Sequence, residues 1–158
     1  MDRRAHALRT DAFFFGMSAE NLRFFLSQPW MMAGSDASLR SPEGPLSHDH
    51  PHPRAYGSHA RLLALARGEG PLSLAETVRR MTSLPAQAFG LSGYGAVAPG
   101  AVADLAVFDA ATVCDRSTYA EPHRFAEGVR HVFVAGMPVL LDGRDTPHRP
   151  GRWLVPAR

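Results

Sequence analysis

The sequence lacks lysine and isoleucine entirely and has one cysteine among its 158 residues. A single cysteine excludes an internal disulfide framework and a zinc site built only from cysteines. The chain also has no run of about 18 apolar residues, which excludes an ordinary transmembrane helix. The apolar run Ala12–Phe15 is too short for the core of a secretory signal. We therefore expect a soluble, cytoplasmic, globular protein.

The positive charge is evenly spread. All 17 basic side chains are arginines, they are interleaved with 15 acidic residues, and the net charge is +2. Nucleic-acid binding needs a dense basic stripe, and none is visible. We expect neither a nucleic-acid partner nor a membrane partner.

The first part of the chain, to about residue 90, has a helical pattern with one short buried strand. Ser18 can cap a helix over residues 19–26, and Pro29 ends it. The apolar run Trp30–Ala33 shows no alternation, which is typical of a strand buried on both faces of a parallel α/β sheet.

Four prolines interrupt residues 38–53, which predicts a loop. We expect a helix over 59–67 to follow, with Gly68 placed to end it. Ser73 and Glu76 form a capping box at the start of a further helix.

The second part, from about residue 91, is rich in β-strand signals. Strands are predicted over 105–108, 129–135 and 137–141. Ala135 should resist the positive φ of a tight hairpin turn, and Pro138 favours an edge position because it cannot donate to a ladder.

Asp36 is the best-placed candidate for chemistry. It follows the Trp30–Ala33 run after two small residues, and the carboxyl ends of strands point at the active site in β/α folds. A carboxylate there can bind a metal or move a proton. The alternative is an ordinary loop or helix-capping aspartate.

The histidine-rich stretch His48–His52 suggests a metal site, since imidazole and carboxylate groups ligate zinc. It lies in a loop broken by prolines, where nothing fixes ligand geometry, so a histidine-rich surface loop is the preferred interpretation. Arg54 could bind a carboxylate through two hydrogen bonds or could be an ordinary surface arginine. Cys114 receives no role.

Two segments of the second part resemble metal-dependent amidohydrolases. Gly100–Asp109 resembles the Gly-x-x-Ala-Asp-Leu-x-x-Phe-Asp signature near the carboxyl end of that superfamily. His131–Val139 is similar to the Val-x-Val-Asn-Gly-x-x-Val segment that follows it, with Ala135 in place of asparagine.

An ordered set of further segments narrows the resemblance. Together they resemble the C-terminal portion of N-acyl-D-amino-acid deacylases, also called D-aminoacylases, over roughly residues 16–154. The segments are Gly16–Ser18, Gly34–Asp36, His52–Gly57, Met81–Ala86, Asp115–Tyr119 and Pro150–Arg152.

The resemblance implies a zinc hydrolase built on a (β/α)₈ barrel that cleaves the amide bond of N-acyl-D-amino acids. In such an enzyme the metal polarises the amide carbonyl and activates water. The resemblance places Asp36 at the carboxylate that takes the water proton and passes it to the leaving amine. It makes Arg54 the candidate that binds the substrate carboxylate.

The family's zinc ligands have no counterpart in this sequence, so we expect zinc in the complete enzyme and no metal ligands here. A complete barrel needs about 250 residues. We therefore expect an α/β fragment: the last strand and helices of the (β/α)₈ barrel in residues 1–90, and part of a small β-rich domain in 91–158. An upstream polypeptide that completes the barrel is an expected partner.

Two alternatives stay open. The chain could belong to another amidohydrolase of the hydantoinase or dihydroorotase type. It could also be a non-catalytic truncated remnant, or a module that completes another subunit.

Overall fold

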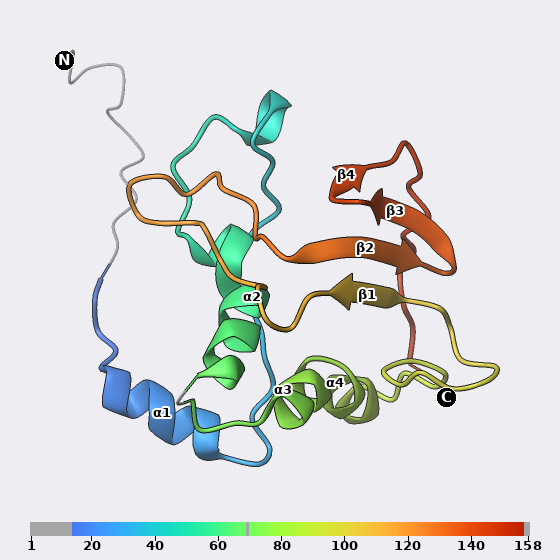
Figure 1. Cartoon of the computed structure of the whole chain (residues 1–158), viewed down its shortest axis with the longest axis horizontal. Coiled ribbons are helices and arrows are strands. Elements are labelled where there is room, and N and C mark those ends of the chain that lie inside the picture. Colours follow the sequence, from blue (N-terminus) through green and yellow to red (C-terminus); the bar gives the residue numbers. More distant parts are fainter. Residues whose placement is uncertain (1–13, 69, 157–158) are drawn as a thin grey trace.

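The computed structural model describes residues 14–68 and 70–156 and places the helices to one side of a single sheet (Figure 1). The apolar run Ala12–Phe15 lies partly outside the described residues. The helices are α1 (Ala19–Ser27), the 3-10 helix η1 (Gly44–Leu46), α2 (Arg54–Arg67), α3 (Leu74–Met81) and α4 (Ser83–Ala88). The strands are β1 (Leu105–Phe108), β2 (Val129–Val134), β3 (Met137–Leu141) and β4 (Arg144–Asp145).

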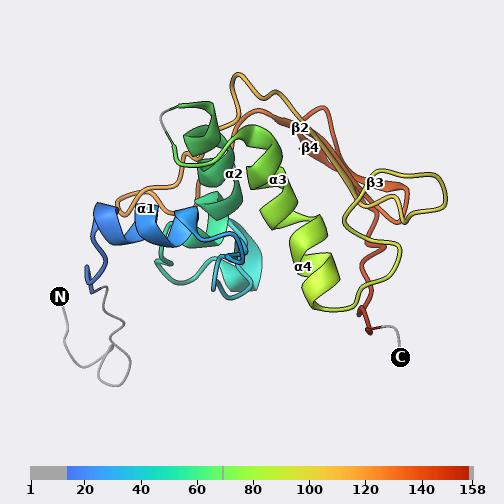
Figure 2. The same cartoon turned by 90° about the horizontal axis from the view of Figure 1, so that it is seen from below.

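The four strands form one antiparallel sheet in the order β1-β2-β3-β4. Figure 2 shows α3 and α4 along one face of this sheet. The three predicted strands are confirmed, and β4 is an addition. Asp142-Gly143, with φ of 49° and 74°, forms the β3–β4 turn. Aspartate followed by glycine is a favoured pair for such turns, so this signal was present in the sequence.

The β2–β3 turn uses Ala135 despite its side chain. Ala135 and Gly136 have φ of 50° and 79°, so the expectation that Ala135 would resist a positive φ is wrong. The Asp104 carboxylate accepts a hydrogen bond from the Ala135 N–H at 2.7 Å, and the Gly136 N–H donates to the Ala103 carbonyl at 3.0 Å. These bonds from the segment before β1 offset the strain of the turn.

Pro138 lies in a strand with a neighbour on each side, so the expected edge position is wrong for β3 as a whole. The proline is tolerated because β4 is short and pairs only with Leu140 and Leu141. Next to Pro138 the chain beyond β4 supplies a side chain instead, and the Thr146 hydroxyl donates to the Pro138 carbonyl at 2.6 Å.

Both serine N-caps predicted from the sequence are present, but the Glu76 carboxylate pairs with Arg79 and Arg80 instead of completing the predicted capping box. The Ser18 hydroxyl accepts from the Asn21 N–H, and the Ser73 hydroxyl accepts from the Glu76 N–H. α2, however, begins at Arg54, five residues before the predicted start at 59. Pro53 occupies the N-cap with φ of −51°, a value already suited to a helix, so this proline begins a helix instead of extending the loop.

The predicted strand over Trp30–Ala33 does not form, because no neighbouring strand pairs with it in the part of the chain that the structure describes. Trp30 is 67% exposed, whereas the next three residues are half-buried. The Ala33 N–H donates to the Arg80 carbonyl at 3.1 Å, so α3 holds this extended segment.

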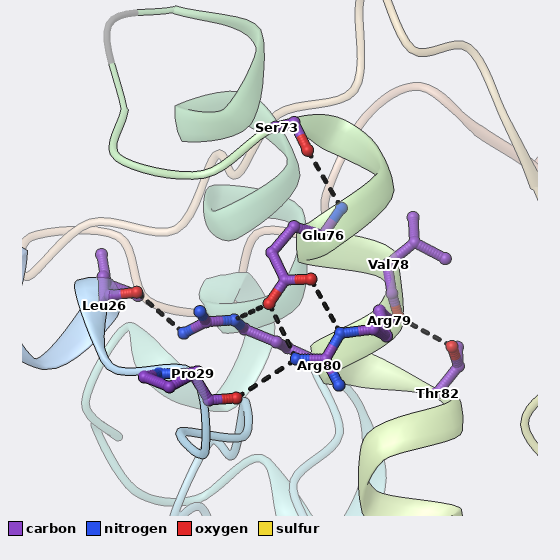
Figure 3. Close-up of polar contacts among 8 residues, drawn as sticks. All are labelled: Leu26, Pro29, Ser73, Glu76, Val78, Arg79, Arg80 and Thr82. Atoms are coloured by element: carbon purple, nitrogen blue, oxygen red, sulfur yellow. Dashed lines mark hydrogen bonds and ion pairs between the residues drawn. The ribbon is translucent and has the colours of Figure 1, made fainter.

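Glu76 and Arg80 connect α3 to α1 (Figure 3). The Glu76 carboxylate accepts from the Arg79 and Arg80 guanidinium groups at 2.7–2.8 Å. Arg80 is only 4% exposed, and its other end donates to the Leu26 carbonyl at the close of α1 at 2.8 Å. Arg79 donates to the Pro29 carbonyl at 3.2 Å. The buried Arg80 thus satisfies one carbonyl that the end of α1 leaves without a helical partner, and Arg79 satisfies the Pro29 carbonyl just beyond it.

The core is small and includes residues from both parts of the chain. Ala60 and Leu63 of α2 pack against the fully buried Val113, and partly buried side chains surround them: Val78, Met81, Phe108, Ala126 and Val129. The chain exposes 11926 Å², whereas a compact monomer of this mass exposes about 7,800 Å². The residues outside the described part can account for at most about 2,500 Å² of this accessible surface. The described residues alone therefore expose more surface than a compact monomer would.

We predict that Glu76 makes the stability of the fold depend on pH in the acid range. Its hydrogen bonds to Arg79 and Arg80 lower the pKa of Glu76 to about 2, below the ordinary value of about 4.3 for glutamate. The stabilisation is therefore complete above about pH 5 and is lost as the pH falls toward 2. Glu76→Gln should flatten the melting temperature against pH in this window. An unchanged slope, or equal flattening by the exposed-site control Glu43→Gln, would contradict this role.

Candidate active site

Asp36 lies where the half-buried segment 31–33 emerges at the surface. Its side chain is 90% exposed, and its φ of 49° is in the left-handed region. Aspartate is one of the few residues other than glycine that adopts this region readily. The Ser35 hydroxyl accepts from the Ala37 N–H at 3.3 Å and tightens the bend on either side of Asp36. Ala135 and Asp142 share this conformation in hairpin turns, so Asp36 is a candidate because of its exposure and its contact with Arg54, not because of its backbone.

Arg54, the first residue of α2, meets Asp36. Its Nη1 lies 3.1 Å from the Asp36 Oδ2, and about half of the Arg54 side chain is exposed. The structure therefore brings the two candidate residues together across eighteen positions of sequence. An exposed pair of this kind contributes only about 0.2–1 kcal/mol, so a competing carboxylate can replace Asp36 on the guanidinium.

The start of α2 packs against the segment 115–123, which passes beside it in Figure 1. Gly57 is buried, and a β-carbon built there would lie 2.9 Å from the Asp115 Cβ. Arg61, one turn further along α2, also reaches the Asp115 carboxylate at 3.5 Å. Two of the segments that carry the family resemblance, His52–Gly57 and Asp115–Tyr119, are therefore in direct contact.

Two histidine–tyrosine pairs cross this contact. The Tyr119 hydroxyl lies 3.0 Å from the His52 Nε2, and the Tyr56 hydroxyl lies 3.2 Å from the His123 Nδ1. His50 and His123 add hydrogen bonds from their Nε2 atoms to the carbonyls of Tyr119, at 2.6 Å, and of Asp49, at 2.9 Å. The histidine-rich loop, residues 48–52, therefore connects the helical part of the chain to the β-rich part through polar contacts.

Burial, and then the neighbouring Arg54 cation, lower the pKa of His52, so both favour the neutral imidazole. Burial raises the pKa of the Tyr56 hydroxyl; Asp49 acts in the same direction and Arg40 against it. Both side chains are therefore held in their neutral forms at neutral pH.

The metal interpretation of His48–His52 receives no support. Within residues 14–68 and 70–156, no group of three or more histidine, cysteine or acidic side chains is placed to hold a metal ion. His50 and His52 are instead directed at Tyr119. Cys114 is a half-buried free thiol whose backbone pairs with Glu127.

Two cavities adjoin Arg54. A small one of about 200 Å³ is polar and has Arg40, Asp49, His52 and Arg54 among its lining residues. A large one of about 770 Å³ lies between the helices and the sheet, with Leu63, Val78, Met81, Leu105 and Val132 in its mainly apolar lining. Asp36 lines neither cavity. The large cavity is thus a surface suited to packing rather than to chemistry.

A family profile described as Amidohydro_3, amidohydrolase family, matches residues 20–140, which is more than half of the chain. The chain belongs to the amidohydrolase family. It is 41% identical over 145 residues to an N-acyl-D-glutamate deacylase, and 39% identical over 146 residues to a D-aminoacylase, both of Alcaligenes xylosoxydans xylosoxydans. These alignments cover 90% and 91% of this amidohydrolase chain but only 28% of each relative.

Solved structures agree with this assignment. A crystal structure of D-aminoacylase superposes with a TM-score of 0.81 at 38% identity, over 90% of this chain and 29% of that one. The N-acyl-D-glutamate deacylase of Bordetella bronchiseptica, solved with zinc and a phosphonate that mimics the tetrahedral intermediate, superposes with a TM-score of 0.70 at 38% identity, over 82% of this chain and 27% of that one. The amidohydrolase chain thus spans somewhat more than a quarter of the proteins it matches. No helix in its described part is long and apolar enough to cross a membrane.

The roles that the sequence predicts for Asp36 and Arg54 stay predictions, and the contacts that hold the start of α2 were not predicted. The sequence does not indicate the contacts of Tyr56, Tyr119 and His123, because their partners are 67 or more positions away. The only available signal was that Tyr56 and Tyr119 both lie inside segments of the family resemblance.

We predict that Gly57→Ala destabilises the joint between α2 and the 115–123 segment. Alanine is the better helix former, but its methyl group would lie 2.9 Å from the Asp115 Cβ and would force the two segments apart. Such overpacking costs about 1–3 kcal/mol of unfolding free energy, measurable by chemical denaturation.

Gly151→Ala is the matched control, because no atom lies within 4 Å of a β-carbon at that position. Equal stability of the two variants would show that Gly57 is not required for close packing.

Proposed function

We propose that this chain is the carboxyl-terminal part of a zinc-dependent hydrolase that cleaves the amide bond of N-acyl-D-amino acids. The observation that carries the proposal is the Asp36–Arg54 pair, at 3.1 Å, in a chain that is 41% and 39% identical to two deacylases of such compounds. An exposed carboxylate beside an exposed guanidinium provides a proton carrier and a binding group for a substrate carboxylate.

In the proposed reaction, water adds to the amide carbonyl carbon and the carbon–nitrogen bond breaks. The Asp36 carboxylate accepts one proton from the attacking water and returns it to the leaving nitrogen, acting first as general base and then as general acid. The products are a carboxylate and a D-amino acid. The exposure of Asp36 supports this role, since an accessible carboxylate can reach both water and the leaving group.

Arg54 would bind the α-carboxylate of the substrate through its planar guanidinium. Its weak pairing with Asp36 keeps the side chain directed toward the site in the absence of substrate. The substrate carboxylate would displace Asp36 from Arg54, so binding itself would free the proton carrier.

The described residues do not fit a zinc site, as they contain no suitable ligand group. We therefore propose that the zinc ligands of the complete enzyme lie outside the described residues, and we assign the described residues no metal-dependent step. We further propose that residues 1–90 end the (β/α)₈ barrel and that 91–158 form part of a small β-rich domain. The cytoplasmic location stays a prediction.

Exposed apolar residues and the large cavity support a requirement for an additional polypeptide. Along α1 and the segment after it, Phe24, Phe25 and Trp30 are 43–67% exposed. Phe24 and Phe25 also contact each other, and we infer that these exposed aromatic side chains pack against another polypeptide. The segment 31–33 also has the apolar composition of a barrel strand but no strand partner within the described residues.

We predict that Asp36→Asn lowers kcat of the assembled enzyme about 10²–10⁴-fold, the usual contribution of a general base. Asparagine tolerates the same left-handed backbone, so the site should keep its shape. Hydrolysis of an N-acyl-D-amino acid gives kcat, and elemental analysis should show an unchanged zinc content.

The matched control is Asp142→Asn, at an exposed aspartate that also has a φ of 49° but lies in the β3–β4 turn. Full activity of the Asp36 variant, or an equal loss in the Asp142 variant, would remove Asp36 from its proposed role. Hydrolysis of cyclic ureides in preference to N-acyl-D-amino acids would favour a hydantoinase-type enzyme instead.

We predict that the isolated chain is marginally stable or aggregates, and that a polypeptide carrying the rest of the family's length stabilises it. Binding at a free concentration one hundred times Kd adds about 2.7 kcal/mol. Size-exclusion chromatography and thermal unfolding, with and without the added polypeptide, measure the effect. A cooperative, monomeric transition that the added polypeptide does not change would contradict this requirement.

A further inference from the structure

His52 connects Arg54 to the β-rich part of the chain. Its Nδ1 accepts a hydrogen bond from the Arg54 backbone N–H at 3.0 Å, which satisfies one of the donors that the start of α2 leaves free. Its Nε2 lies 3.0 Å from the Tyr119 hydroxyl, and the two rings meet edge to face with centroids 5.1 Å apart. The ring is therefore held at both nitrogens.

These contacts define the protonation state of His52. Because Nδ1 accepts from a backbone N–H, the ring proton must lie on Nε2, which then donates to the Tyr119 oxygen. Protonation of Nδ1 would remove the acceptor and place a second cation beside Arg54. The lowered pKa of His52 agrees with this geometry, since it favours the neutral ring.

Tyr119 is itself fixed in place. Its carbonyl accepts from the His50 Nε2 at 2.6 Å, and its ring packs edge to face against Phe15 with centroids 5.2 Å apart. The parallel pair of Tyr56 with His123 ties the first turn of α2 to the same segment. The His52 ring therefore rests on an anchored partner.

We propose that His52, held by Tyr119, is a positioning residue for Arg54. It fixes the first turn of α2 so that the guanidinium faces Asp36 and, in the enzyme proposed above, the carboxylate of the substrate. The segment 115–123 thereby sets substrate affinity without touching the substrate. The inference rests on the proposed function for its kinetic consequence but not for its structural one.

Two substitutions separate the two nitrogens of the ring. His52→Asn keeps an oxygen at the position of Nδ1 and can still accept from the Arg54 N–H, whereas His52→Gln places its amide near the position of Nε2 and loses that acceptor. The structural measurement is NMR of the chain labelled with ¹⁵N at histidine and arginine, with the completing polypeptide bound if folding requires it. We expect the Nε2–H tautomer at His52, an Arg54 amide signal retained in His52→Asn, and a shifted one in His52→Gln.

The kinetic measurement uses the assembled enzyme and an N-acyl-D-amino acid. His52→Gln should raise KM about 10-fold, an effect of the order of a lost helix cap, with kcat changed less than about 2-fold. His52→Asn should restore most of the affinity. In an Arg54→Met background, His52→Gln should add no further change in KM, because the positioned group is then absent.

The pH profile supplies an independent check. Among the described residues, the ionisable groups near His52 include Arg54 beside it, Tyr119 on its far side, and Arg40, Asp49 and His50 across the small cavity. Because the pKa of His52 is lowered, KM should rise only at a pH below the ordinary histidine value of about 6.5, as His52 becomes protonated. This rise should be absent from His52→Asn, which has no group that titrates there.

The outcomes separate the two proposals. An unchanged Arg54 amide signal in His52→Gln, or equal KM effects of the Asn and Gln variants, would overturn the positioning role. If the assembled enzyme hydrolyses no N-acyl-D-amino acid, the proposed function fails, and the NMR comparison alone decides whether His52 positions Arg54.

Discussion

The bonds of Glu76 with Arg80 are the constraint on which the candidate site depends. A buried guanidinium is costly without hydrogen-bond partners, and Arg80 donates to the Glu76 carboxylate and to the Leu26 carbonyl of α1. The backbone of the same residue accepts from Ala33. One arginine on α3 therefore fixes both the end of α1 and the extended segment that leads to Asp36. Since few large side chains are buried, these polar contacts carry an unusual share of the positioning.

A separate set of contacts positions Arg54 beside Asp36. α2 begins directly after Pro53, its first backbone N–H donates to the His52 imidazole, and Gly57 packs closely against Asp115. The first turn is therefore held by residues from both parts of the chain. The helical part supplies Asp36, and the contact with the β-rich part sets the direction of Arg54. The weak Asp36–Arg54 ion pair therefore joins two segments that are each held in place by other contacts.

Local chemistry could be predicted from the sequence, and long-range pairing could not. Ser18 and Ser73 cap their helices as expected, because capping acts over three residues. Trp30–Ala33 has the composition of a barrel strand, yet a strand exists only where a neighbour completes its hydrogen bonds, and that depends on residues elsewhere. Motif order predicted Asp36 and Arg54 as site residues, and the structure shows them 3.1 Å apart. Tyr119 and Glu76 support these two residues through contacts between positions far apart in the sequence. Hydrophobic periodicity does not predict such contacts.

Asp104 lies in the family signature of residues 100–109, and its role there is structural and not catalytic. Its carboxylate holds the strained β2–β3 turn, in which Ala135 replaces the asparagine of the family pattern, far from Asp36 in sequence. Selection on such a residue preserves the scaffold whether or not a working centre accompanies it. A genome survey that recognises amidohydrolases by this segment would therefore count scaffolds, and each would need a separate check for the groups that perform hydrolysis.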